Sequence, residues 1–468
     1  MDLTALTVTR LRGALANGEV RSVDLADQLI ARTDACAQLN CYVDFDAQDL
    51  RRQAREADAR LAAGERLPLL GVPIALKDNI EAIGLQCGNG TRALHGRRPQ
   101  QDAALVGRLR AAGALIAGKL GMHELAFGIT SNNAVTGAIR NPWDPARIPG
   151  GSSGGSGAAV SAHLVPASIG TDTGGSVRVP AALCGVAGLR PTVGRVSAEG
   201  IAPISATRDT AGPIARCVAD LALIDGVLTG DDAPPPSATL GNLRLGVPSD
   251  YYWSDLDPGV ASAAQGALSI LRDAGATLVP VELPGLAELD GEVSFVVALY
   301  EFVRDMTAYL KDRSRGISFE TLVSGIGSAD VKAIAGALAG DGAVPRAAYE
   351  QALQARVRLQ ALYAGTFASA RVSALLFPTT PLTAAPIGQD ETVMHNGRAC
   401  PTFGTFIRNT DPGSNASLPG VTLPIGLCDG LPVGLALDGP IGNDRQLLGI
   451  AAAIEAVLAP MPAAPYPR

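Results

Sequence analysis

Short apolar runs alternate with helix-like stretches along most of this chain, and this alternation limits the fold more than any other feature. The runs carry no regular polar alternation, which is typical of strands that are buried on both faces of a sheet. They occupy residues 73–76, 114–117, 243–247, 277–281, 374–377, 421–424 and 433–437. The pattern therefore predicts an α/β protein with a single large mixed β-sheet, covered by helices on both faces.

Composition excludes several other classes of protein. The chain has 54 Gly and 32 Pro among 468 residues, which is incompatible with a coiled coil or a plain helix bundle. With 47% hydrophobic and 18% charged residues, it can bury a large core, so intrinsic disorder is excluded. Its net charge of -7 provides no concentrated basic surface, and we expect no nucleic-acid partner.

The sequence also predicts a location. It shows neither an apolar stretch of signal-peptide length at its start nor a later uninterrupted run of about 18 apolar residues. We therefore expect a cytoplasmic protein without a membrane partner. The 7 Cys are odd in number and include no C-x-x-C pair, so most are expected to be small buried hydrophobic residues.

We expect one domain that spans residues 1–468. Residues 1–65 would form an N-terminal helical segment, in which Ser22 is a plausible helix cap. Residues 66–225 would form the core, and residues 226–468 the second half of the same sheet. The proline-rich stretch at 231–236 is interpreted as a surface loop between the two halves and not as a domain linker.

Two glycine-serine loops lie on either side of an apolar segment. They read GGSSGGSG at 150–157 and GTDTGGSVRVP at 170–180, with a short helix and a strand expected between them. One such tract is usually a flexible loop, but two at this spacing indicate a site. Neither completes a nucleotide-binding motif of the G-x-x-x-x-G-K-[ST] or G-x-G-x-x-G type, so nucleotide binding has no support.

Residues 151–155 match the G-x-S-x-G pattern, which would make Ser153 a nucleophile if an acid and a histidine followed it. Of the 4 His, only His395 lies well downstream, in a polar stretch that resembles a turn. A Ser-His-Asp hydrolase is therefore disfavoured. A serine hydrolase without histidine still needs a base, and a neutral lysine can serve.

Lys77 is the candidate base, because it ends an apolar run that would bury its stem. Burial lowers the pKa of a lysine. A pKa near 7 requires a shift of about three units, on the order of 4 to 5 kcal/mol. An ion pair between Lys77 and Asp78 explains the same residues equally well, and both interpretations stay open.

Lys77 and the two loops together resemble the amidase signature family, over residues 60–225 and 370–460. Within that family, further segments look like the bacterial indoleacetamide and mandelamide hydrolases. These segments are 122–133, 140–145, 207–213, 386–390 and 408–420. The resemblance implies the amidase signature fold.

The resemblance also implies a Ser-cis-Ser-Lys triad. Carried onto this sequence, Ser176 is the nucleophile, Ser152 is a bridging serine that follows a cis peptide bond, and Lys77 is the base. The backbone N–H groups of Thr173, Gly174, Gly175 and Ser176 would form the oxyanion hole.

Two further groups of residues follow from the resemblance. Asp172 and Arg178 would brace the nucleophile, although an ordinary surface ion pair is the alternative. The acyl pocket would be lined by Phe127, Gly128 and Ile129, and closed by residues 387–389 and Phe403.

The implied function is hydrolysis of a small, aryl-substituted primary amide through an acyl-serine, with no metal or organic cofactor. Amidotransferase subunits that use glutamine commonly carry Asp-Gln where this chain has Asp209-Thr210, which argues against glutamine as substrate. The alternatives are an ammonia-supplying or carboxybiuret-type subunit that needs a partner protein, and an inactive binding scaffold. The resemblance allows a homodimer, but no segment identifies an interface.

Overall fold

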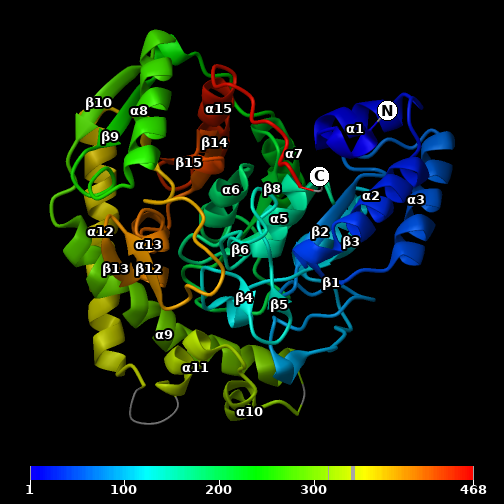
Figure 1. Ribbon diagram of the computed structural model, residues 1–468, viewed down its shortest axis with the longest axis horizontal. Helices are drawn as coiled ribbons and strands as arrows, with labels where there is room; N and C mark the ends of the chain where they lie inside the picture. The colour runs from blue at the N-terminus through cyan, green and yellow to red at the C-terminus, as the bar shows by residue number, and fades with distance from the viewer. Residues whose placement is uncertain (1, 315, 339–342, 467–468) are drawn as a thin grey trace.

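The computed structural model describes residues 2–314, 316–338 and 343–466, and its centre is one mixed sheet of 11 strands (Figure 1). The strand order is β1-β3-β2-β6-β8-β7-β14-β15-β11-β9-β10. The strands are β1 (Tyr42–Asp44), β2 (Pro73–Lys77), β3 (Leu115–Leu120), β6 (Ala167–Asp172), β7 (Ala187–Arg190), β8 (Thr210–Ala215), β9 (Arg244–Pro248), β10 (Thr277–Val281), β11 (Ala374–Pro378), β14 (Gly420–Cys428) and β15 (Leu431–Asp438). Two small hairpins lie outside this sheet: β4 (Asn132–Asn133) with β5 (Gly137–Ala138), and β12 (Thr392–His395) with β13 (Arg398–Pro401).

Parallel and antiparallel pairs both occur in the large sheet. β2 is parallel to β3 and β6, and β9 is parallel to β10 and β11, whereas the other neighbouring pairs are antiparallel. Every apolar run that predicts a strand does form one. The prediction of a mixed sheet is therefore confirmed, while β1, β7 and β8 are additional strands that the pattern does not indicate.

Helices cover both faces of the sheet. They are α1 (Val8–Ala16), α2 (Ser22–Ala35), α3 (Ala47–Ala62), α4 (Ala104–Ala111), α5 (Gly154–Ser161), α6 (Arg178–Cys184), α7 (Val218–Thr229), α8 (Pro258–Asp273), α9 (Leu286–Arg313), α10 (Phe319–Ser324), α11 (Ala329–Gly336), α12 (Arg346–Ala370), α13 (Thr402–Ile407), α14 (Asp411–Asn415) and α15 (Asp444–Glu455). Side chains alternate along β2, as they do in any strand. Ile74 and Leu76 pack with Leu221 of α7 in one apolar cluster, whereas Ala75 packs with Val160 of α5 in another.

Ser22 does not cap its helix. It is the first residue of α2, and its hydroxyl donates to the carbonyl of Gly71 at 2.8 Å. The backbone N–H groups of Ser22 and Val23 instead donate to the carboxylate of Asp58 on α3, at 2.6 and 3.1 Å. The carboxylate that serves this helix start therefore comes from a neighbouring helix, which a local sequence pattern does not reveal.

The sheet brings the segments of interest to one edge. β2 ends at Lys77 and its parallel neighbour β6 ends at Asp172, so their carboxyl ends lie side by side. α5 begins just after Ser153, and α6 begins two residues after Ser176. Polar groups at this edge of parallel strands are well placed to meet a ligand.

Candidate active site

Lys77 lies fully buried against two hydroxyl groups. Its Nζ is 2.8 Å from Ser152 Oγ and donates to Thr171 Oγ1 at 2.7 Å. Burial lowers the pKa of Lys77 from 10.5 to about 7, against the opposing effect of the Asp172 and Asp209 charges. Near neutral pH, Lys77 is therefore able to accept a proton.

The ion pair between Lys77 and Asp78 is contradicted. No ion pair among the described residues joins these two side chains. Asp78 is buried, and its two carboxylate oxygens accept from the backbone N–H groups of Gly88 and Gly90, at 3.2 and 3.1 Å. Asp78 therefore holds a neighbouring loop.

Ser152 follows a cis peptide bond from Gly151, which is the geometry that the resemblance implies. The serine is buried, and its carbonyl accepts from the backbone N–H of His123 at 3.0 Å. The glycines of this loop permit close packing, since a Cβ at Gly155 would lie 2.6 Å from the carbonyl oxygen of Gly121. The loop is thus held tightly beside Lys77.

The Ser176 turn lies next to the Ser152 loop. The backbone N–H of Ser153 donates to the carbonyl of Ser176 at 3.2 Å. The Ser176 side chain lines a cavity, and across the described ranges its hydroxyl forms no hydrogen bond with another residue. The structure therefore joins Lys77 to Ser152 directly, and brings Ser176 near them through the backbone.

Ser153 is a structural residue in this arrangement. It is fully buried, and its hydroxyl donates to the carbonyl of Thr171 and accepts from the Thr171 N–H, at 3.1 and 3.3 Å. His395 donates from Nε2 to the carbonyl of Asp255 at 2.6 Å. Ser153 and His395 thus have separate partners, and a Ser-His-Asp site has no support.

One of the four expected oxyanion donors is already engaged. The N–H of Gly175 donates to Asp172 Oδ1 at 2.8 Å, whereas those of Thr173, Gly174 and Ser176 have no acceptor within the described part of the chain. Gly175 has a φ of 142°, and a Cβ there would lie 2.2 Å from Thr410 Oγ1. The expectation is therefore wrong for Gly175, whose N–H already has an acceptor, and stays a prediction for the other three N–H groups.

Asp172 and Arg178 form a buried cluster and not a surface ion pair. Asp172 Oδ2 is 3.1 Å from Arg178 Nε, and Asp172 Oδ1 is 3.0 Å from Arg190 Nη1. Burial raises the pKa of Asp172, but the charges of Arg178 and Arg190 outweigh it and hold that pKa below its usual range. Arg190 completes this cluster, although the sequence motifs do not point to it.

The cavity beside Ser176, called the Ser176 cavity below, has mainly apolar walls. They include Phe127, Ile204, Phe295, Ile334, Phe403 and Ile407, while its polar side is formed by Arg208, Ser294 and Asp411. Phe127 and Phe403 thus both line the cavity beside Ser176, and their role in holding an acyl group stays a prediction. Phe295 and Ser294 belong to the long helix α9, which is far from both loops in the sequence but contributes to the same cavity.

Gly128 and Ile129 do not line this cavity, which corrects the expectation for both. A Cβ at Gly128 would lie 2.1 Å from the His123 ring, and Ile129 packs with Phe406 in an apolar cluster behind the cavity wall that Ile407 forms. Of residues 387–389, Gly388 and Gln389 line another pocket. The Ile129 backbone lies against Gly151 instead, where a Cβ would be 2.9 Å from the Ile129 carbonyl carbon.

An ion pair that the sequence reasoning missed closes the polar side of the Ser176 cavity. Arg208 pairs with Asp411, which also accepts from the Ser294 hydroxyl. Arg208 donates to the carbonyl of Thr173 at 3.3 Å and thereby contacts the Ser176 turn. Both charged residues lie within segments that carry the family resemblance, 207–213 and 408–420. This resemblance is the sequence feature that could have identified them as site residues.

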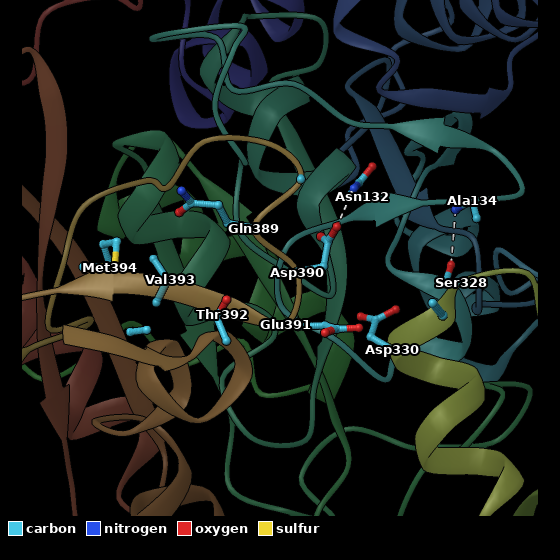
Figure 2. A pocket seen from close by; sticks show the side chains of 13 residues that line it. Asn132, Ala134, Ser328, Asp330, Gln389, Asp390, Glu391, Thr392, Val393 and Met394 are labelled. Carbon is cyan, nitrogen blue, oxygen red and sulfur yellow. Dashed lines mark hydrogen bonds between the residues drawn. The ribbon is translucent and has the colours of Figure 1, made fainter.

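A separate acidic pocket of about 530 Å³ lies between α11 and the β12–β13 hairpin (Figure 2). Asp330 and Glu391 approach each other there, and Asp390 accepts from Asn132 Nδ2 at 2.7 Å. Lys77, Ser152 and Ser176 do not line it. The pocket is therefore distinct from the candidate active site.

Comparisons with known proteins agree with this geometry. A family model described as Amidase matches residues 24–448. The chain is 46% identical over 435 residues to an indoleacetamide hydrolase of Rhizobium radiobacter, covering 92% of this chain and 93% of the relative. It is 41% identical to a mandelamide hydrolase of Pseudomonas putida, covering 97% and 92%.

Among solved structures, the native peptide amidase from Stenotrophomonas maltophilia superposes with a TM-score of 0.85 and 31% identity, covering 99% of each chain. The chain belongs to the amidase signature family. It is an enzyme that hydrolyses amide carbon-nitrogen bonds of small molecules.

Across residues 2–314, 316–338 and 343–466, no helix combines the length and the apolar character needed to cross a bilayer. Within the same ranges, no group of three or more His, Cys, Asp or Glu is arranged to hold a metal ion.

Proposed function

We propose that this enzyme hydrolyses a small, aryl-substituted primary amide through an acyl-Ser176 intermediate. The observation that carries the proposal is the buried Lys77, with a pKa of about 7 and its Nζ 2.8 Å from Ser152 Oγ. Ser176 Oγ attacks the carbonyl carbon while its proton passes through Ser152 to Lys77. The proton then returns to the nitrogen, ammonia leaves, and a water activated by the same relay releases the acid.

The three unengaged N–H groups, of Thr173, Gly174 and Ser176, stabilise the negative charge that develops on the carbonyl oxygen. Loss of one such donor typically costs about 10² to 10³ in rate. Asp172 supports this turn, because it accepts from the N–H of Gly175 at 2.8 Å and is itself held by Arg178 and Arg190.

The walls of the Ser176 cavity favour an aromatic acyl group. Phe127, Phe295 and Phe403 supply aromatic surface, and the relatives with 46% and 41% identity are named as indoleacetamide and mandelamide hydrolases. The void itself is about 50 Å³, and Phe295 is 47% exposed. We therefore expect an aryl group to displace the Phe295 ring outward, a side-chain movement that exposed residues make readily.

We further propose that residues 1–468 act as one catalytic domain, because strands from 66–225 and from 226–468 join one sheet. Location in the cytoplasm and assembly as a homodimer stay predictions.

The deciding experiment is ammonia release by the purified chain alone from indoleacetamide, mandelamide, malonamide and glutamine. We expect turnover of the two aryl amides. The Ser176→Ala variant should lose it, whereas Ser156→Ala, which alters a buried serine of α5 outside the Ser176 cavity, should retain it. Silence on every amide would favour a subunit that needs a partner protein, or an inactive scaffold.

A further inference from the structure

A second cavity, of about 400 Å³, lies beside the Ser176 cavity, and we call it the Thr171 cavity. Ala126, Thr173 and Ile204 line both cavities and form the partition between them. Thr171 lines only the second. The two cavities therefore meet at Thr173. One lies on the side of Ser176, and the other lies on the side of Thr171, which accepts a hydrogen bond from Lys77.

The Thr171 cavity lies on the side from which protons reach a leaving nitrogen. Thr171 Oγ1 accepts from Lys77 Nζ at 2.7 Å, and Lys77 is 2.8 Å from Ser152 Oγ. In the proposed reaction, on which this inference rests, the nitrogen must take its proton from that relay. A substituent on the nitrogen would then extend toward Thr171, while the acyl group stays beside Ser176.

A buried acceptor in this cavity has no partner. Asn79 is 2% exposed and lines the cavity, and its Nδ2 donates to Thr171 Oγ1 at 3.1 Å. Its Oδ1 is buried and forms no hydrogen bond within the described part of the chain. An unsatisfied buried polar group is destabilising. The N–H of a bound amide would satisfy it.

The size and charge of the cavity exceed what ammonia needs. A water molecule, which is close to ammonia in size, takes about 30 Å³ of liquid volume. Four carboxylates and one guanidinium line the cavity, those of Glu199, Asp209, Asp305, Asp312 and Arg313. Arg313 pairs with Glu199 and Asp312, and Asp305 pairs with Arg304 outside the lining, so within the described residues Asp209 is the lining carboxylate that has no ion-pair partner. This excess of carboxylates favours a cationic group.

We propose that the Thr171 cavity is a subsite for a leaving amine, so that the enzyme also hydrolyses secondary amides whose nitrogen carries a basic substituent. Ser176 Oγ bonds to the carbonyl carbon, and the carbon-nitrogen bond breaks as the nitrogen takes the proton that came from Ser176. The amine leaves, and water then supplies hydroxide to the acyl group and a proton to Ser176.

The test compares phenylacetamide with two secondary amides of it, N-(2-aminoethyl)phenylacetamide and its neutral counterpart N-propylphenylacetamide, by release of phenylacetate. We expect all three to be hydrolysed, with kcat/KM for the aminoethyl amide about tenfold above that for the propyl amide. Asp312→Asn should shrink that preference.

A bulky residue in the cavity gives a second readout. Ala308 of α9 is exposed and lines the cavity, so Ala308→Trp should lower kcat/KM for both secondary amides about tenfold relative to phenylacetamide. Ala287→Trp, at an exposed alanine of the same helix outside the cavity, is the matched control. A uniform slowing of all three amides by Ala308→Trp would mean that the cavity holds the acyl group, and would overturn the inference.

The two proposals fail in different ways. Turnover of phenylacetamide without turnover of either secondary amide overturns the leaving-amine subsite alone. Absence of turnover with all three amides overturns the proposed function itself.

Discussion

Lys77 and Arg178 are both fully buried basic side chains at the same edge of the sheet, yet their environments shift their pKa values in opposite directions. Within the described residues, Lys77 Nζ forms hydrogen bonds only to hydroxyl and carbonyl oxygens, and burial lowers the pKa of Lys77 to about 7. Burial also lowers the pKa of Arg178, but the Asp172 and Asp438 carboxylates outweigh it and raise that pKa above its ordinary value. The partner, and not burial alone, decides which buried group stays charged.

Removal of the Lys77 amine should have the largest effect. Because Lys77 is the proposed proton acceptor, Lys77→Met should lower kcat about 10⁴-fold or more. Lys77→Arg should be equally inactive, since a guanidinium keeps its proton. Initial rates with an aryl amide measure the loss, and urea unfolding checks that both variants fold. Substantial activity in either variant would end the lysine-base mechanism.

Breaking the paired cluster should mainly cost stability. Asp172→Asn removes the nearest carboxylate from two buried guanidinium groups, and of the two Arg178 alone keeps another, Asp438 at 3.8 Å, within the described residues. The variant should lower the free energy of unfolding by about 3 to 5 kcal/mol. Asp144→Asn, which breaks an ion pair with the partly exposed Arg147, is the control and should cost about 1 kcal/mol or less. Urea titration measures the free energy of unfolding of both variants. Equal decreases would show that the buried cluster contributes no more to stability than the exposed ion pair.

The smallest expected effect is on the pH dependence of the rate, which reports directly on the protonation of Lys77. Lys77 must be neutral to act, and it loses its proton as pH rises through about 7. Below that pH, kcat/KM should therefore rise about tenfold per pH unit and then level off. Asp209 raises the pKa of Lys77, so Asp209→Asn should move the midpoint to lower pH. If kcat/KM showed neither the rise below pH 7 nor the shift in Asp209→Asn, deprotonation of Lys77 would not control the rate.

Sequence patterns predict most of this fold where strands are apolar and continuous. β11 (Ala374–Pro378) is such a strand, because every residue of it is buried. β8 escapes prediction, since Gly212 and Pro213 lie inside it and both residues disfavour strands. It forms because β6 and β7 flank it on both sides, and tertiary contacts outweigh local preference.

The candidate site divides in the same way. Lys77, Ser152 and Ser176 stand in recognisable segments, so sequence alone could name them. The pair of Arg208 with Asp411 joins residues 203 positions apart, and no spacing rule connects them. Gly128 was misplaced for a related reason, because its contact with the His123 ring depends on how the loop turns back on itself.

Both cavities draw a wall from α9, a single helix of 28 residues, through Ser294, Phe295 and Ala298 on one side and Asp305, Ala308 and Tyr309 on the other. The reactive side chains come from elsewhere in the chain. One helix can therefore be altered, by mutation or by engineering, to retune both halves of the accepted molecule at once while the proton-handling groups stay untouched. Substrate range in this fold can therefore change independently of the residues that transfer protons.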